Sequence, residues 1–250
     1  MKTDRIAAVA FDLDGTLVDL ERFHHEAWLR AARSAGVELT WDQALRQLPN
    51  FIGGPDARVA AQIMDLAPAG ASPERTLTAK ERWFSALVDA VEEIVPRAGV
   101  AELLDGLRSR GIPVAVATST ERGTALTILH RAGLLPLFGA ARVVSAQDVA
   151  QPKPAPDAYR ITAWRLRVPL SAQLVFEDSL VGMSAARAAG CPFVAVPTVT
   201  DPGYLASVTA AGAVGVFDSW QDPDLSLLLE RLLSAEAAVG TAPGAAGVRP

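Results

Sequence analysis

Residues 7–11 form a short apolar run that ends abruptly at two carboxylates, Asp12 and Asp14, followed by Gly15. A strand that is apolar on both faces is typical of a parallel sheet covered by helices, where ligands bind beyond the carboxyl ends of the strands. Because Asp12 and Asp14 are two residues apart, we expect their side chains to point the same way. The pattern predicts a buried strand with acids at its tip; an ordinary Asp-Gly turn is the alternative.

The next part of the chain shows helical periodicity without any strand between the helices. Thr40 begins a capping-box pattern, and Ser72-Pro73 is typical of a helix start. We expect helices from Leu20 to Gly36, from Thr40 onward, from the Gly53-Gly54-Pro55 loop to Leu66, and from Ser72 to about Ile94. Residues 19–95 are therefore predicted to form a separate helical cap.

From Pro96 onward, helices and strands alternate, which predicts an α/β fold with a doubly wound parallel sheet of the Rossmann type. The expected strands cover residues 112–117, 174–176 and 193–196, with two more near residues 143 and 214. The expected helices are one that ends at residue 111 and four that cover residues 121–132, 156–167, 179–189 and 225–233. Residues 1–18 and 96–234 would form the core domain, and the cap would be inserted after the first strand. The tail 235–250, rich in alanine, glycine and proline, is predicted to be disordered.

Composition narrows the possible partners and the compartment. The 250 residues are 50% hydrophobic and carry a net charge of −5, which suits one sizeable core and argues against nucleic acid as a partner. The single cysteine, Cys191, excludes an internal disulfide and fits a reducing, cytoplasmic location. The apolar run before Asp12 is too short for a signal peptide or a membrane span, so we expect no membrane association.

Two further predicted strand ends carry groups suited to phosphate. Thr118-Ser119-Thr120 stands between a strand and a helix N-terminus, where hydroxyl and N–H groups bind anions. The alternative, compatible with the first, is that Ser119 or Thr120 simply caps the helix. Lys153 lies among three prolines that stiffen the backbone, so its ammonium is a fixed point charge for a phosphate or a carboxylate, rather than a solvated loop lysine.

The strand at 174–176 ends in a second acidic pair, Glu177-Asp178. In a parallel sheet its tip is expected beside that of the first strand. Carboxylates that converge from two strands supply the hard oxygen ligands that Mg²⁺ prefers, with waters and a substrate phosphate completing the octahedron. The sequence therefore predicts a Mg²⁺ site.

The four motifs, in order, resemble those of the haloacid dehalogenase superfamily. They are Asp12-Leu13-Asp14-Gly15-Thr16-Leu17-Val18-Asp19, Thr118-Ser119, Lys153-Pro154-Ala155-Pro156 and Glu177-Asp178-Ser179-Leu180-Val181-Gly182. The resemblance covers about residues 6–197. The position and the helical character of the insert further resemble members with a small cap, especially β-phosphoglucomutases and sugar-phosphate or phosphoglycolate phosphatases.

The resemblance implies a role for each motif. Asp12 would be the nucleophile that forms an aspartyl-phosphate, and Asp14 the general acid and base. Mg²⁺ would be held by the Asp12 carboxylate, the Asp14 main-chain carbonyl and Asp178, with Glu177 as an additional or outer ligand. Lys153, Thr118 and the Ser119 N–H would hold the phosphate oxygens. Dehalogenases lack the second acid of the first motif, so Asp14 argues for phosphate chemistry.

Candidate substrate contacts in the cap are His24 and Arg58. His24 and Trp28 lie four residues apart, as in a segment of the mutases, so His24 would orient Asp14 or touch a sugar hydroxyl. The alternative is a surface histidine beside a core tryptophan. Arg58 would meet a second phosphate or a sugar acid, unless it faces solvent. His25 and His130 are interpreted as surface residues.

These observations predict a phosphatase that acts on a small phosphorylated sugar or organic acid. The alternative enzyme is a hexose-phosphate mutase of the β-phosphoglucomutase type. Glu121 and Arg122 stand where those mutases carry lysine and asparagine, and Arg82-Trp83-Phe84, near Lys80, replaces another lysine-asparagine pair. These departures favour the phosphatase. A non-catalytic binding protein on the same fold is the third hypothesis, and the sequence makes no prediction of oligomeric state.

Overall fold

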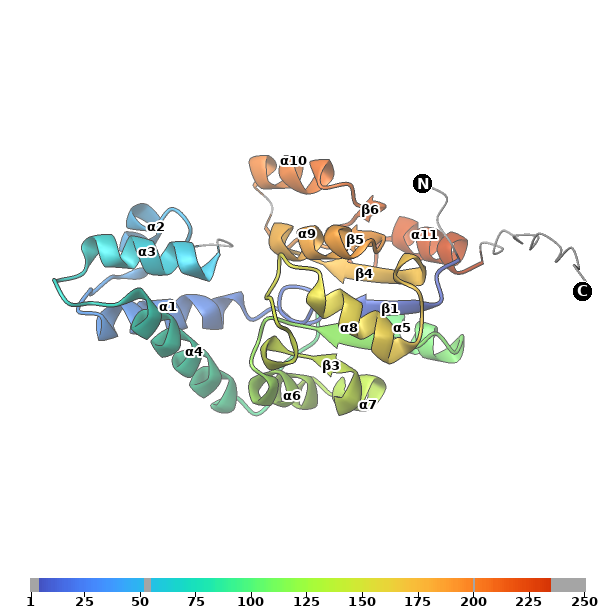
Figure 1. Ribbon diagram of the computed structural model, residues 1–250, viewed down its shortest axis with the longest axis horizontal. Helices are drawn as coiled ribbons and strands as arrows, with labels where there is room; N and C mark the ends of the chain where they lie inside the picture. Colours follow the sequence, from blue (N-terminus) through green and yellow to red (C-terminus); the bar gives the residue numbers. More distant parts are fainter. Residues whose placement is uncertain (1–4, 52–54, 200, 235–250) are drawn as a thin grey trace, which may run out of the picture.

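A six-stranded parallel sheet organises the computed structural model, which describes residues 5–51, 55–199 and 201–234 (Figure 1). Its strands are β1 (Ala8–Phe11), β2 (Val114–Ala117), β3 (Val143–Val144), β4 (Gln173–Glu177), β5 (Phe193–Ala195) and β6 (Gly215–Val216). The spatial order is β3-β2-β1-β4-β5-β6, and every neighbouring pair is parallel. The predicted doubly wound α/β sheet is confirmed, with β4 beside β1 as expected.

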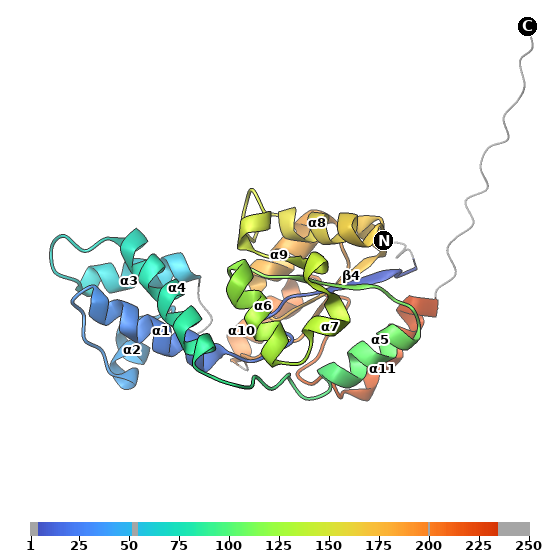
Figure 2. The ribbon, with the colours of Figure 1, turned by 90° about the horizontal axis from the view of Figure 1, so that it is seen from below.

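Alternate residues of β1 face two different apolar layers, as the period of two in a strand requires. Val9 and Phe11 pack into the layer that includes side chains of α5 (Val100–Ser109), α6 (Arg122–Arg131), α7 (Leu135–Phe138) and α11 (Pro223–Ser234). Ala10 packs into the layer of α8 (Asp157–Leu166), α9 (Leu180–Ala189) and α10 (Pro202–Ala210). Figure 2 shows α8 and α5 on opposite sides of the strands. Short 3₁₀ turns occur at Ala140–Arg142, Ala146–Asp148 and Leu170–Ala172.

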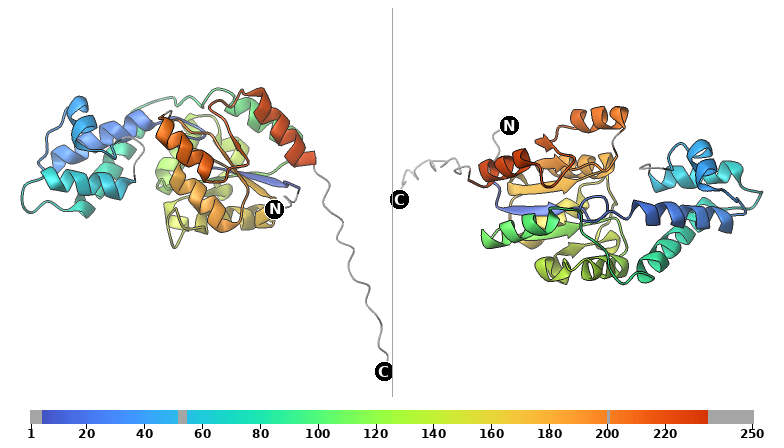
Figure 3. Two further views of the ribbon diagram at one scale, coloured as in Figure 1. Left: turned by 90° about the horizontal axis from the view of Figure 1, so that it is seen from above. Right: turned by 180° about the vertical axis from the view of Figure 1, so that it is seen from behind.

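Four helices form a separate group beyond the carboxyl ends of the strands (Figures 1 and 3). They are α1 (Glu21–Ser34), α2 (Trp41–Gln47), α3 (Asp56–Leu66) and α4 (Pro73–Asp89). The group has its own apolar core, in which Trp28, Phe51 and Ile63 are buried. We describe this group as the cap helices; the division into a core domain (1–18 and 96–234) and a cap domain (19–95) stays a prediction.

The two chain segments that join the cap helices to the sheet run side by side. Val18 forms an antiparallel bridge with Pro96, and the Arg97 N–H donates to the Leu17 carbonyl at 2.9 Å. The half-buried Arg97 guanidinium also donates to the carbonyls of Gly15 and Val196, at 2.5 and 2.8 Å. Burial lowers the pKa of Arg97. This arginine therefore ties the loop after β1 to the end of β5.

Several local expectations are confirmed and others are wrong. The capping box of Thr40 and Gln43 is present. Helix α4 ends at Asp89 rather than near Ile94. The cap of α6 is Glu121, whose carboxylate accepts the Thr124 N–H at 3.0 Å, and not Ser119 or Thr120. Helices α7 and α10 were not expected.

The predicted disordered tail, 235–250, and Gly53 and Gly54 of the predicted loop lie outside the described residues. None of the helices in the described ranges combines the length and apolar character that a membrane crossing requires.

Candidate active site

The first acidic motif lies at the tip of β1, between the tips of β2 and β4. The Asp12 N–H extends the parallel ladder by donating to the Phe176 carbonyl at 3.0 Å. The chain then turns tightly at Gly15, whose φ of 81° is a left-handed conformation that favours glycine. Trp220 donates its indole N–H to the Thr16 carbonyl at 3.2 Å. The loop that carries Asp12 and Asp14 is thus fixed by distant parts of the chain.

Lys153 lies at the centre of the three strand tips. Its ammonium contacts Asp12 Oδ1 and Glu177 Oε1, each at 2.6 Å, and the Ala117 carbonyl at 2.9 Å. Burial by itself would lower the pKa of Lys153, but Asp12 and Glu177 outweigh burial and raise it. Lys153 therefore keeps its charge and connects β1, β2 and β4.

Glu177 is fully buried, and both of its carboxylate oxygens have partners. Oε1 accepts from Lys153 and from the Tyr159 hydroxyl, while Oε2 accepts from the Ser179 hydroxyl at 3.1 Å. The carboxylate lies against Gly182 in the first turn of α9, where an added Cβ would come within 1.8 Å of Oε1. Glu177 is thus placed to hold Lys153. Its role as an additional or outer ligand of Mg²⁺ stays a prediction.

Asp178 lies against the loop after β1. Thr16 donates its hydroxyl to Asp178 Oδ1 at 3.1 Å, and the Tyr204 hydroxyl donates to the Asp178 carbonyl at 2.9 Å. An added Cβ at Gly15 would lie 2.1 Å from Asp178 Oδ2. Close approach of the two loops therefore requires glycine at position 15.

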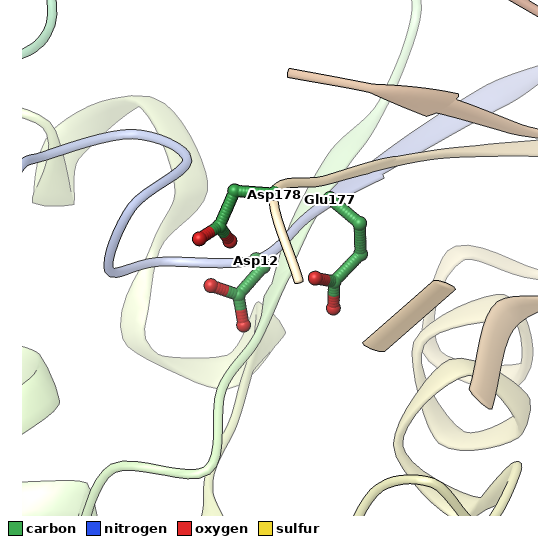
Figure 4. Close-up of side chains that lie close together, drawn as sticks. All are labelled: Asp12, Glu177 and Asp178. Atoms are coloured by element: carbon green, nitrogen blue, oxygen red, sulfur yellow. The ribbon is translucent and has the colours of Figure 1, made fainter. Parts of the chain in front are cut away.

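One carboxylate oxygen from each of Asp12, Glu177 and Asp178 lies within 4.8 Å of the others. Figure 4 shows the Asp12 and Asp178 carboxylates close together, with that of Glu177 to one side. Burial and the neighbouring carboxylates raise the pKa of Asp178 well above its usual range, and burial raises that of Asp12 to about 7 although Lys153 lowers it. Of these three carboxylates, those of Asp12 and Glu177 contact the Lys153 ammonium. The remaining negative charge on closely spaced oxygen donors fits a divalent cation.

Asp14 is held by the beginning of α1. Its Oδ1 accepts the Leu20 N–H at 2.9 Å, and its Oδ2 pairs with His24 Nε2. The His24 ring stacks on Phe84 of α4, with centroids 4.1 Å apart and an interplanar angle of 11°. His24 therefore contacts Asp14, as one interpretation of the sequence expected, and links that acid to two cap helices.

Thr118 and Ser119 follow β2, on the side of β1 opposite to β4. The Thr118 hydroxyl is buried and accepts the Thr120 N–H at 3.0 Å, whereas Ser119 is exposed. Lys153 binds the carbonyl of the preceding residue, Ala117. The three residues that are predicted to bind phosphate, Thr118, Ser119 and Lys153, thus lie on neighbouring segments at the same edge of the sheet.

A cavity of about 220 Å³ lies between the strand tips and the cap helices. This volume is below the roughly 300 Å³ at which pockets for drug-sized ligands begin, so it suits a small molecule. The sheet side of the lining includes Asp14, Gly15, Asp178, Ser179 and Tyr204, and the cap side includes His24, His25, Trp28, Phe51, Asp56 and Lys80.

Two expectations about the cap differ from the structure. Arg58 is exposed on α3 and is absent from the described lining of the cavity. His25 is buried rather than on the surface, because Trp41 and Phe51 cover it with ring centroids 4.9 and 5.0 Å away. His130 is exposed, as expected.

Sequence reasoning missed Tyr159, Tyr204, Arg97 and Asp56 as members of this region. Asp56 follows Pro55 at the start of α3. Acids are common in the first turn of a helix, so the sequence gives no reason to assign this one to a site. The tyrosines and Arg97 carry no local signal, because their partners are more than 15 residues away in the chain.

Comparisons with known proteins agree with this geometry. The family model described as haloacid dehalogenase-like hydrolase matches residues 6–190. The chain is 33% identical to the protein CbbY of Rhodobacter capsulatus over 226 residues (88% of this chain, 94% of that protein). It is 35% identical to the fructose-1-phosphate phosphatase YqaB of Escherichia coli over 194 residues (77% and 97%).

A crystal structure of a CbbY mutant from Rhodobacter sphaeroides in complex with xylulose 1,5-bisphosphate has a similar fold. The TM-score is 0.68 and the sequence identity 27%, and the match covers 87% of this chain and 96% of that one. The family model spans both acidic motifs and the lysine that joins them, so the predicted resemblance is confirmed. The chain belongs to the haloacid dehalogenase-like hydrolases.

Proposed function

We propose that the protein is a Mg²⁺-dependent phosphatase that hydrolyses a small phosphorylated sugar or organic acid. The observation that carries the proposal is the position of the Asp12 carboxylate, one oxygen of which is bound by Lys153 at 2.6 Å. Lys153 orients this carboxylate, and the second acid, Asp14, lies on the same loop beside the cavity. A nucleophile and an acid in such an arrangement suit transfer of a phosphoryl group. Phosphatase relatives support the same reaction.

In the proposed reaction, an Asp12 oxygen forms a bond to phosphorus while the bond between phosphorus and the ester oxygen breaks. Asp14 donates a proton to the departing oxygen, then takes a proton from the water that hydrolyses the aspartyl-phosphate. Its contacts with Leu20 and His24 hold it in place for both steps. Lys153, Thr118 and the Ser119 N–H would bind the remaining phosphate oxygens.

Asp12, Asp178 and the Asp14 carbonyl would hold Mg²⁺, with Glu177 acting through Lys153. The excess of carboxylates over cations at the strand tips supports this assignment. When bound, Mg²⁺ would neutralise negative charge on the transferred phosphoryl group.

Release of phosphate from a panel of phosphorylated sugars and acids, with and without Mg²⁺, tests the proposal. We expect release only with Mg²⁺, and none from Asp12→Asn. Asp105→Asn, an exposed acid on α5, is the matched control and should retain activity. Activity that survives Asp12→Asn would contradict the assignment of the nucleophile.

The same panel separates the alternatives. With β-glucose 1-phosphate and a bisphosphate primer, a mutase would produce glucose 6-phosphate faster than free phosphate, and we expect the reverse. No release from any ester would instead favour a non-catalytic binding protein.

A further inference from the structure

The cavity beside Asp14 is lined by more acids than bases. Five carboxylates contribute to its described lining, those of Asp14, Asp19, Glu21, Asp56 and Asp178. The basic side chains there are His24, His25 and Lys80. Two of the acids, Asp14 and Asp178, belong to the proposed reaction centre. The part of the lining that the cap helices supply lies on the other side of the cavity, where it would face the rest of a substrate.

Lys80 is already neutralised by Asp56. Its side chain is only 6% exposed, and its ammonium lies 2.7 Å from Asp56 Oδ2. The rings of Trp28 and Phe84 are 5.6 and 5.7 Å from the ammonium, close enough for cation–π attraction. The cation is therefore fixed in place from α4, while the Asp56 side chain remains half exposed.

The two histidines are also engaged. His24 pairs with Asp14. His25 is buried against Trp41 and Phe51, and its Nε2 lies 3.4 Å from Glu21 Oε1. Among the described residues of this lining, every basic side chain thus has an acidic partner.

This arrangement has opposite consequences for hydroxyl groups and for phosphate. A fixed pair of carboxylate and ammonium offers an acceptor and donors side by side, which suits hydroxyl groups of a sugar or polyol. A second phosphate would approach the half-exposed Asp56 carboxylate without a free cation to compensate for the repulsion. The wall thus favours an uncharged, hydroxylated group.

We propose that this cavity selects phosphate monoesters whose remaining part is uncharged and hydroxylated, that it rejects bisphosphates, and that Asp56 and Lys80 determine this choice. The inference rests on the proposed phosphatase function and narrows its substrate class. The relatives do not decide the matter, because one is a fructose-1-phosphate phosphatase and another was crystallised with xylulose 1,5-bisphosphate.

The test compares two esters that differ only in a second phosphate, fructose 1-phosphate and fructose 1,6-bisphosphate. We expect the wild-type kcat/KM, measured as phosphate release, to be at least tenfold higher for the monophosphate. Asp56→Asn leaves the Lys80 charge without its carboxylate, so this preference should fall at least threefold, through a lower KM for the bisphosphate. Asp65→Asn is the control, an exposed acid on the same helix outside the cavity lining, and should leave the preference unchanged.

Equal kcat/KM values for the two esters, or a wild-type preference for the bisphosphate, would overturn the inference. So would an unchanged preference in a folded Asp56→Asn protein. Circular dichroism establishes whether that variant folds; if it does not, the wild-type preference decides.

p-Nitrophenyl phosphate, which has no second anionic group, separates this inference from the proposed function. If the wild type hydrolyses neither it nor the sugar esters, the phosphatase proposal fails. The inference is then judged by calorimetric titration of the same two fructose esters into the wild-type protein. Tighter binding of the monophosphate supports it, and equal or tighter binding of the bisphosphate overturns it.

Discussion

Tyr159→Phe tests whether the Glu177 carboxylate depends on a charge-assisted hydrogen bond. Tyr159 is fully buried and donates its hydroxyl to Glu177 Oε1, and its ring lies 5.0 Å from the Lys153 ammonium. Phenylalanine keeps the ring and removes only the hydroxyl. Because hydrogen bonds to charged groups contribute about 1.5–3 kcal/mol, we expect the free energy of unfolding to fall by about 2 kcal/mol.

The second tyrosine of the chain, Tyr204, provides a matched control, because its hydroxyl donates to Asp178, the residue after Glu177. The acceptor there is the neutral carbonyl of Asp178, and Tyr204 is partly exposed. Burial and the nearby carboxylates raise the pKa of Tyr159 well above its usual range and that of Tyr204 to about 12, so both hydroxyls donate at pH 8. For Tyr204→Phe we expect a loss of about 1 kcal/mol, as for neutral hydrogen bonds.

Urea unfolding at pH 8, followed by circular dichroism, measures both losses as changes in the midpoint at constant slope. The test is whether Tyr159→Phe loses more stability than Tyr204→Phe. A Tyr159→Phe protein that is as stable as the wild type, or more stable than Tyr204→Phe, would refute a charge-assisted bond to Glu177.

Three other perturbations have defined outcomes. Gly182→Ala should lower the free energy of unfolding, measured in urea, by about 3–5 kcal/mol, because the added Cβ displaces Glu177 from Lys153. Gly106→Ala is the control and should not destabilise the protein, because an added Cβ at this position on α5 meets no other atom. Equal effects of the two substitutions would contradict the close approach of Gly182 and Glu177. Burial would raise the pKa of Asp148, but hydrogen bonds from Ser145 and Arg165 outweigh burial and lower this pKa to about 2. The ionised Asp148 carboxylate therefore stabilises the folded protein fully above about pH 4, and this stabilisation is lost as the pH falls toward 2. The difference in melting temperature between the wild type and Asp148→Asn should shrink over that interval, and a constant difference would argue against the shift. Mg²⁺ at about 100 times its Kd should stabilise the wild type by about 2.7 kcal/mol and Asp178→Asn much less, in thermal melts with chelator as the reference; equal stabilisation would place the ion elsewhere.

The cluster of acids and Lys153 at the strand tips was the most predictable part of the molecule. A run that is apolar at every position and ends in acids predicts a buried strand. Because the carboxyl ends of parallel strands meet at one edge of the sheet, the end of this strand is then expected beside the ends of the neighbouring strands. The pairing of Phe11 with Phe176 follows this rule and brings Asp12 and Asp178 together. Lys153 was identified because prolines surround it. The chemical roles of these residues stay predictions until the variants are measured.

The cap was less predictable, because its burial depends on contacts between helices. The periodicity of α1 marks an apolar face, yet His25 is buried only because Trp41 and Phe51 from two other segments cover it. Arg58 and Asp56 lie two residues apart on α3, and no local pattern tells which of them faces the cavity. Helix α10 was missed although Asp201 and Pro202 form a start signal, because the helix has only one fully buried residue, Val208.

The bridge between Val18 and Pro96 means that the chain leaves the sheet and returns to it at a single point. A segment with adjacent ends can be exchanged for another of different length without pulling the strands apart. The helices between these two residues can therefore be replaced by those of a relative while the acidic cluster at the strand tips stays as it is.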